Sequence, residues 1–76
     1  MQGPAVLQWE RVIHKSARTS DGVPTGYIAA EDEDSIIVLS GRFTEYRIPK
    51  SHVEAFDGSQ VQLDFPSTDL SIYKIV

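Results

Sequence analysis

The chain has 76 residues, a formal net charge of −4 and no cysteine, so it offers one small domain with a single core and excludes disulfides and thiolate catalysis. No apolar run reaches the roughly 18 residues of a membrane span, and Met1-Gln2-Gly3-Pro4 lacks the basic and apolar regions of a signal peptide. We therefore expect a cytoplasmic protein without membrane insertion. The negative charge and the dispersed basic residues argue against nucleic acid as its partner.

The first predicted strand precedes an Asp-Gly turn. Residues 1–11 follow no clear period, and we interpret them as an N-terminal arm or a lead-in to the first strand, with a single domain over residues 12–76. Val12–Thr19 is predicted to be a strand because Asp21-Gly22 is a favoured two-residue hairpin turn, and such a turn joins two strands. The short apolar segment Tyr27–Ala30 belongs to the second strand.

An acidic connection separates this hairpin from the most strongly β-branched run. Glu31–Asp34 is interpreted as a solvated turn because it lacks the alternating ligands and central glycine of a calcium loop. The run Ile36–Leu39 predicts a central strand. Both of its faces are apolar, one of them through Ile37 and Leu39, which implies cover on both sides or a partner surface.

The next segment predicts an amphipathic strand followed by a helical turn. Phe43–Ile48 is the strand, and Pro49 ends it because proline cannot donate to a sheet ladder. Ser51 and Glu54 have the S-x-x-E spacing of a capping box, which predicts a single helical turn there.

The last strand has the cleanest alternation in the chain. In Gln60–Phe65, every second residue is apolar and is predicted to face the core: Val61, Leu63 and Phe65. Pro66 ends this strand, and Ser67–Tyr73 predicts a short terminal helix. Together the elements predict an all-β fold, a small antiparallel β-barrel or β-roll of about five or six strands in meander order with one or two short helical turns.

Two segments resemble the PRC-barrel family. Val12–Ile28 is similar to the family's opening hairpin, and Tyr46–Gly58 with Val61–Asp64 is similar to its later half, particularly in small stand-alone archaeal and bacterial members. The resemblance covers about residues 12–73 at turn and core positions, so it implies a fold more than an activity. His14 departs from the pattern, since relatives often carry glycine there. The family includes the cytoplasmic domain of the photosynthetic reaction-centre H subunit, a domain of a ribosome-maturation factor and archaeal cell-division adaptors. What these share is docking onto other proteins, which the resemblance implies here.

No motif predicts a reaction. His52 next to Ser51, or near Asp57, does not form an oriented nucleophile, base and third group, and the chain has no glycine-rich oxyanion motif. Neither His14 nor His52 has a second metal-ligating residue at a suitable spacing. We therefore predict that the protein is not an enzyme and has no catalytic, cofactor-binding or metal site.

The remaining hypothesis is a protein–protein interaction or adaptor module that self-associates, as a homodimer, through a strand edge or a sheet face. The candidate interface residues are Leu7, Trp9, Ile37, Leu39, Phe43 and Tyr46. Trp9 is either an interface anchor or a plug at one barrel end, and Phe43 is either exposed or turned inward by a bulge. An alternative is an accessory domain in ribosome or RNA maturation that contacts ribosomal protein or RNA. A third is a small-molecule or ion sensor at the barrel mouth near Phe56 and Tyr46.

Overall fold

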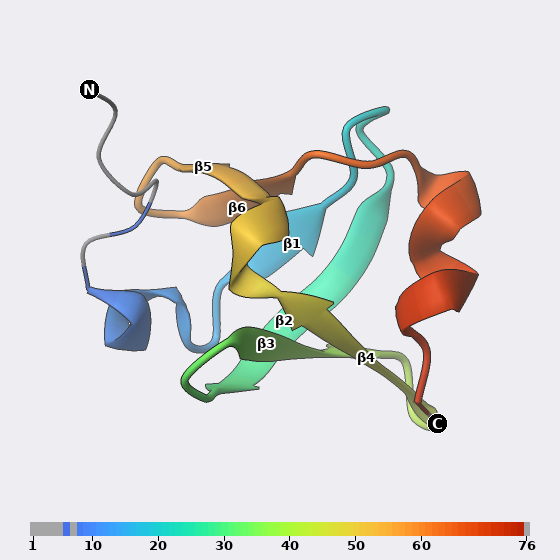
Figure 1. The fold of residues 1–76 in the computed structure, drawn as a ribbon, viewed down its shortest axis with the longest axis horizontal. Coiled ribbons are helices and arrows are strands. Elements are labelled where there is room, and N and C mark those ends of the chain that lie inside the picture. The colour runs from blue at the N-terminus through green and yellow to red at the C-terminus, as the bar shows by residue number, and fades with distance from the viewer. Residues whose placement is uncertain (1–5, 7, 76) are drawn as a thin grey trace.

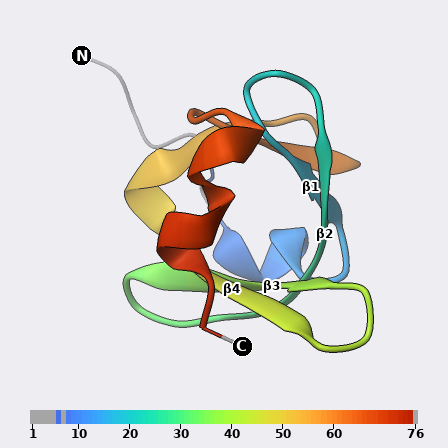
Figure 2. The same cartoon turned by 90° about the vertical axis from the view of Figure 1, so that its right-hand side faces the viewer.

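Six strands form one curled sheet, which a computed structural model describes together with its connections over Val6 and residues 8–75. The sheet order is β4-β3-β2-β1-β6-β5, and in Figure 2 the strands wrap around one interior (Figures 1 and 2). The predicted all-β, barrel-like fold is confirmed. The strands are β1 Ser16–Arg18, β2 Pro24–Glu31, β3 Ser35–Ser40, β4 Thr44–Pro49, β5 Val53–Phe56 and β6 Gln60–Leu63.

Three short 3-10 helices complete the fold. The first, η1, spans Trp9–Val12 and precedes β1, and η2, Lys50–His52, joins the two edge strands β4 and β5. The third, η3, spans Ser67–Tyr73 and packs beside β4 (Figure 1). The predicted terminal helix is therefore confirmed in position and has 3-10 geometry. Among the residues described, none of the helical segments has the length and apolar character needed to cross a bilayer.

The core is filled by alternate residues of the strands. The inward face predicted for the last strand is confirmed, and β3 buries Ile36 and Val38 completely. Since successive side chains of a strand point to opposite faces, Ile37 and Leu39 lie on the outer side of the sheet. The core consists of Val6, Val12, Ala17, Ile28, Ile36, Val38, Ile48, Val53, Val61, Leu63 and Phe65.

The first strand is shorter than predicted, so the expectation of a strand over Val12–Thr19 is wrong. Val12 ends η1, and His14 has a φ of +69°. That left-handed backbone conformation is incompatible with an extended strand and is uncommon for a residue with a Cβ. The N–H of Lys15 instead donates to the Val12 carbonyl at 3.0 Å, closing a tight turn before β1 begins.

The predicted two-residue hairpin turn is also wrong, because five residues, 19–23, connect β1 to β2, and Ser20-Asp21-Gly22 form the tip of this connection. The N–H of Thr19 donates to the carbonyl of Val23 at 3.0 Å and so closes the loop. Gly22 takes the left-handed conformation, with a φ of +82°, as expected of the last residue in a three-residue loop. The Asp21 carboxylate accepts from the Thr19 and Ser67 hydroxyls, which ties the loop to η3.

The predicted capping box does not form. Val53–Phe56 is strand β5, and the helical turn lies earlier, at Lys50–His52. Glu54 is an exposed residue of β5, and no side chain caps η2. Pairing with β6 gives this segment a ladder of backbone hydrogen bonds, whereas an isolated helical turn is weakly stable.

The predicted meander order fails between β4 and β5, which do not pair and form the two edges of the sheet, while β1 pairs with β6. This pairing is parallel, with Ser16 opposite Gln60 and Arg18 opposite Gln62. It joins the β2-β3-β4 meander to the β5-β6 hairpin in one sheet. The region predicted as an arm also contributes to the core, because Val6 is buried and Trp9 packs against the buried residues.

Candidate interaction surface

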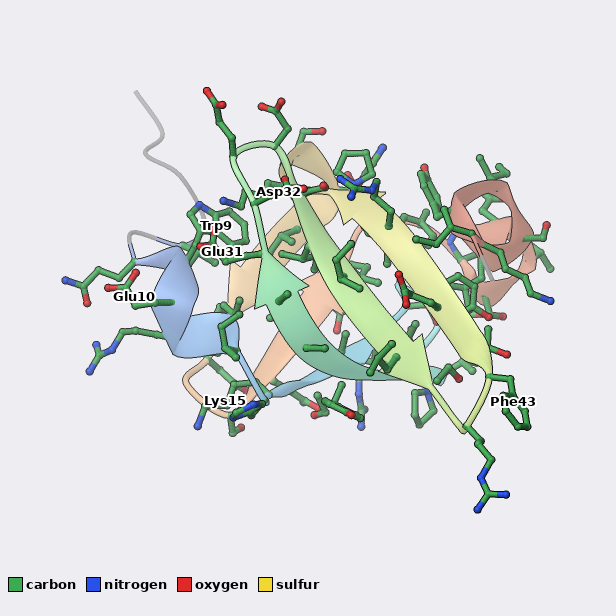
Figure 3. All side chains as sticks on the ribbon, turned by 90° about the horizontal axis from the view of Figure 1, so that it is seen from below. Trp9, Glu10, Lys15, Glu31, Asp32 and Phe43 are labelled. Carbon is green, nitrogen blue, oxygen red and sulfur yellow. The ribbon has the colours of Figure 1, made fainter. Side chains whose placement is uncertain are left out.

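The outer face of β2, β3 and β4, seen from below in Figure 3, carries a small apolar patch. Ile37 and Leu39 are half-buried there, on the side of β3 opposite its core residues. The sheet register places Tyr27 of β2 directly opposite Leu39. The side chain of Tyr27 is 46% exposed. Tyr27, Ile37 and Leu39 together are called the outer patch below.

Charged residues of β4 border the outer patch. Glu45 lies opposite Leu39, and Arg47 lies opposite Ile37. The Arg47 guanidinium donates to Oδ2 of Asp32 at 2.6 Å. An apolar centre with charged residues of both signs at its border is the usual composition of a protein–protein interface.

Phe43 is the most exposed large apolar residue of the described chain, at 77%. It lies in the turn at the tip of the β3-β4 hairpin, beyond the outer patch (Figure 3). The β3-β4 register contains no shift, so no bulge turns Phe43 inward. The guanidinium carbon of Arg42 lies 6.0 Å from the centroid of its ring. Of the two alternatives for Phe43, the exposed one is correct.

The other candidate interface residues do not join the outer patch. Tyr46 lies opposite the core residue Val38 and packs against the core from the inner side of the sheet. Trp9 packs against the core from η1, and in Figure 3 it lies at the opposite end of the molecule from Phe43. Leu7 lies outside the described residues.

Tyr27 was not among the sequence-based candidates. Its alternation with the buried Ile28 is the signal that would have placed it on the outer face. Its position opposite Leu39 depends on the register between β2 and β3, which includes an irregularity between Ile28 and Ala30. No local pattern in the sequence predicts that shift.

The two edges of the sheet are protected against further strand pairing. At β4, the N–H of Ile75 donates to the carbonyl of Glu45 at 2.8 Å, and Lys74 forms a bridge with Tyr46. At β5, the strand is short, carries the exposed Glu54 and has a register shift. Short strands, charges and bulges of this kind discourage edge-to-edge association.

His52 is held in a hydrogen-bond network that the sequence did not predict. Its Nδ1 lies 2.9 Å from Oδ1 of Asp64, and its Nε2 lies 3.2 Å from the hydroxyl of Tyr73. The rings of Phe65 and Tyr73 both pack against the imidazole, at centroid distances of 5.7 and 5.5 Å. Both ring nitrogens therefore have partners, which link η2 to the residue that follows β6 and to η3. Ser51 and Asp57, the partners considered from the sequence, do not contact His52 through any described hydrogen bond.

The acidic turn is stabilised by its own backbone and by basic residues. Backbone N–H and hydroxyl donation from Ser35, N–H donation from Asp34 and the Arg47 guanidinium hold the pKa of Asp32 well below its usual range. Lys50 donates to Oε1 of Glu31 at 2.6 Å. Across the described part of the chain, no group of three or more histidine, cysteine or acidic residues could hold a metal ion.

Comparison with known proteins finds no matching family model, no matching curated protein and no matching solved structure.

Proposed function

We propose that the protein is a non-enzymatic interaction module that self-associates through the outer patch. The observation that carries the proposal is the position of Tyr27, Ile37 and Leu39. These apolar side chains share an outer sheet face, while the inner face is already filled by the core. Packing this face against a second apolar surface removes it from water, which is the main favourable term in protein association.

A sheet face supports this role better than a strand edge does. Both edge strands carry features that oppose strand addition, including the pairing of Ile75 with Glu45. Two-fold symmetry also suits the patch, because a two-fold interface uses the same surface on both copies. Glu45 and Arg47 border the same patch, so each copy presents both signs of charge to the other.

The resemblance to PRC-barrel domains supports an adaptor role, since docking onto other proteins is what the named members of that family share. The φ of +69° at His14 agrees with the resemblance, because relatives often carry glycine at that position. The proposal places the module in the cytoplasm, with which a chain free of cysteine is compatible. Cell fractionation tests this location, and recovery in a secreted fraction would contradict it.

The alternative role in ribosome or RNA maturation has weaker support. Two of the basic residues that could contact RNA, Arg47 and Lys50, are paired with Asp32 and Glu31 at 2.6 Å each. Breaking those pairs would offset part of the gain from phosphate contacts. A mobility shift with RNA that weakens as salt is raised would favour this alternative over self-association.

Light scattering coupled to size-exclusion chromatography tests the proposed self-association over a range of concentrations. The wild type is expected to dimerise as concentration rises. Leu39→Glu is expected to remain monomeric, because it places a charge in the centre of the patch. Ile72→Glu is the matched control, since Ile72 is a 71% exposed apolar residue of η3 outside the patch.

Circular dichroism melting shows whether each variant keeps its fold. A wild type that stays monomeric at the highest concentration would reject self-association. Equal weakening of the dimer by Leu39→Glu and Ile72→Glu would reject the outer patch as the interface.

A further inference from the structure

A pocket of about 320 Å³ lies beside the turn that joins β5 to β6. Among the described residues, those that line it are Arg11, Lys15, Phe56 and Gly58, and none of these four belongs to the outer patch. The volume falls near the lower end of the range found for small-molecule sites.

Two segments that are distant in sequence, residues 11–15 and 56–58, build this pocket. Arg11 comes from η1, Lys15 precedes β1, and Gly58 lies in the β5-β6 turn. The parallel pairing of β1 with β6 places Ser16 opposite Gln60, which brings Lys15 next to that turn. In Figure 3, Lys15 lies beside the loop that joins β5 and β6.

The backbone of Lys15 is fixed on both sides. Its N–H donates to the carbonyl of Val12 at 3.0 Å, and its own carbonyl accepts from the N–H of Ile28 at 2.8 Å. The side chain is half-buried. The backbone position that presents Lys15 to the pocket is therefore held in place by two hydrogen bonds.

Arg11 and Lys15 bring two positive charges to one pocket of a protein whose net charge is −4. Within the described residues, the ion pairs join Arg47 to Asp32, Lys50 to Glu31 and His52 to Asp64, so neither pocket cation takes part. Two like charges in one concave site repel each other, and a bound anion relieves that repulsion.

The carboxylate nearest in sequence to Gly58 is occupied within its own turn. Oδ1 of Asp57 accepts from the N–H and hydroxyl of Ser59 and from the N–H of Gln60, each at 2.9 Å. Phe56 adds an apolar wall to the pocket, since its ring is half-buried and packs against the core. The pocket thus combines two cations with one aromatic surface.

We propose that this pocket binds a small organic anion. Its phosphate or carboxylate group lies between Arg11 and Lys15, and its apolar part packs against Phe56. Cationic side chains form charge-assisted hydrogen bonds with either anionic group. The site is independent of the outer patch. It makes the hypothesis of a sensor near Phe56 specific, because it names an organic anion as the ligand.

Titrations of the isotope-labelled full chain, followed by amide NMR shifts, test the proposal with phenyl phosphate and with benzoate. Saturable shifts are expected at residues 11–15 and 56–59, with a dissociation constant of about 1 mM or below for the better ligand. Comparing the two ligands distinguishes a phosphate from a carboxylate site. Inorganic phosphate is expected to bind more weakly because it lacks the apolar part, and benzyl alcohol is expected not to bind because it lacks the charge.

The double variant Arg11→Gln/Lys15→Gln is expected to weaken binding by at least about tenfold, because each charge-assisted hydrogen bond contributes to affinity. Arg11 is exposed, so Arg11→Gln alone provides the same test with little risk to the fold. Arg42→Gln is the matched control, since Arg42 is an exposed cation beside an aromatic ring but outside the pocket.

Absence of saturable binding by both organic anions would overturn the proposal. Equal affinity of the wild type and the double variant, or equal weakening by Arg42→Gln, would overturn it as well. Tighter binding of benzyl alcohol than of phenyl phosphate would show that the pocket selects apolar groups and would overturn the anion assignment.

Discussion

The Lys50 ammonium lies 4.8 Å from the centroid of the Trp9 ring. The same ammonium donates to Glu31 at 2.6 Å. This contact connects η1, which precedes β1, to η2, which follows β4, so it joins two helical turns that are separated in sequence by four strands. Trp9 therefore contributes to the stability of the fold, and its packing against the core supports the same conclusion.

Trp9→Ala is expected to lower the free energy of unfolding by about 2 kcal/mol, because a half-buried aromatic side chain loses its packing. Lys50→Met keeps the apolar stem, removes the charge and is expected to cost about 1 kcal/mol through the lost contacts with the ring and with Glu31. Urea denaturation measures both. If Trp9→Ala kept wild-type stability but lost self-association, Trp9 would be an interface residue and the proposed assignment of the outer patch would be wrong.

Gly26→Ala is expected to be among the most destabilising substitutions in the chain, by about 3 kcal/mol or more. A Cβ at this position would overlap the backbone oxygen of Leu39, and the φ of Gly26 is +147°. Gly41 is the control, because a Cβ there meets nothing within 4 Å although its φ is +67°. Gly41→Ala is expected to cost only about 1–2 kcal/mol. Similar denaturation midpoints for the two variants would contradict the close approach of β2 to β3.

His14→Gly is expected to keep or raise the stability by up to about 1 kcal/mol. Glycine adopts a φ of +69° without steric cost, although its more flexible unfolded state offsets part of the gain. His14→Val is expected to destabilise the fold, since a β-branched residue is strongly disfavoured in this conformation. Thermal melts of the two variants provide the comparison, and a lower melting temperature for His14→Gly than for His14→Val would contradict it.

Acid is expected to destabilise the fold because it protonates loop aspartates whose carboxylates accept hydrogen bonds. The pKa values of Asp32, Asp21 and Asp57 are all lowered by hydrogen bonds to their carboxylates. The donor with the largest effect is the Ser35 backbone N–H for Asp32, the Thr19 hydroxyl for Asp21 and the Ser59 backbone N–H for Asp57. A folded-state pKa below the unfolded value of about 3.9 stabilises the fold above that pH. This contribution is lost as the pH falls below about 4 toward the folded-state values.

Asp32→Asn isolates one of these groups, since asparagine keeps an oxygen acceptor but has no charge to titrate. The variant is expected to be less stable than wild type at pH 7, and the difference is expected to shrink on acidification to about pH 2. Denaturation curves at successive pH values measure this difference. A constant difference across the range would mean that ionised Asp32 does not stabilise the turn.

The parts of the fold that were predicted correctly from the sequence are those in which apolar and polar residues alternate along one strand. In β6, Val61 and Leu63 are fully buried as expected, because only one face of that strand meets the core. The strand β5 was missed because Val53–Phe56 has too few residues to show a period, and only β6 makes it a strand. Ser51 and Glu54 matched a helix-capping pattern whose stabilisation is small beside that of strand pairing.

The candidate surfaces were likewise predicted only in part from the sequence. Ile37 and Leu39 follow from the two apolar faces of β3, whereas Tyr27 required the register between two strands. The pocket of Arg11 and Lys15 could not be predicted, because it depends on the pairing of β1 with β6. Contacts between residues this far apart in sequence leave no local pattern.

The pairing of Ser16 with Gln60 has a consequence for how the chain folds. Bringing such distant residues together costs more loop-closure entropy than forming the adjacent β2-β3 and β3-β4 hairpins. We expect the meander to be structured in the folding transition state, while β1 and β6 join afterwards. Stopped-flow kinetics measures the fraction of a variant's loss of stability that is already present in the folding transition state, which is called the kinetic φ-value. This fraction is expected to be roughly 0–0.3 for Val61→Ala and higher for Val38→Ala. The reverse ranking would show that the most distant contacts form first and nucleate the sheet.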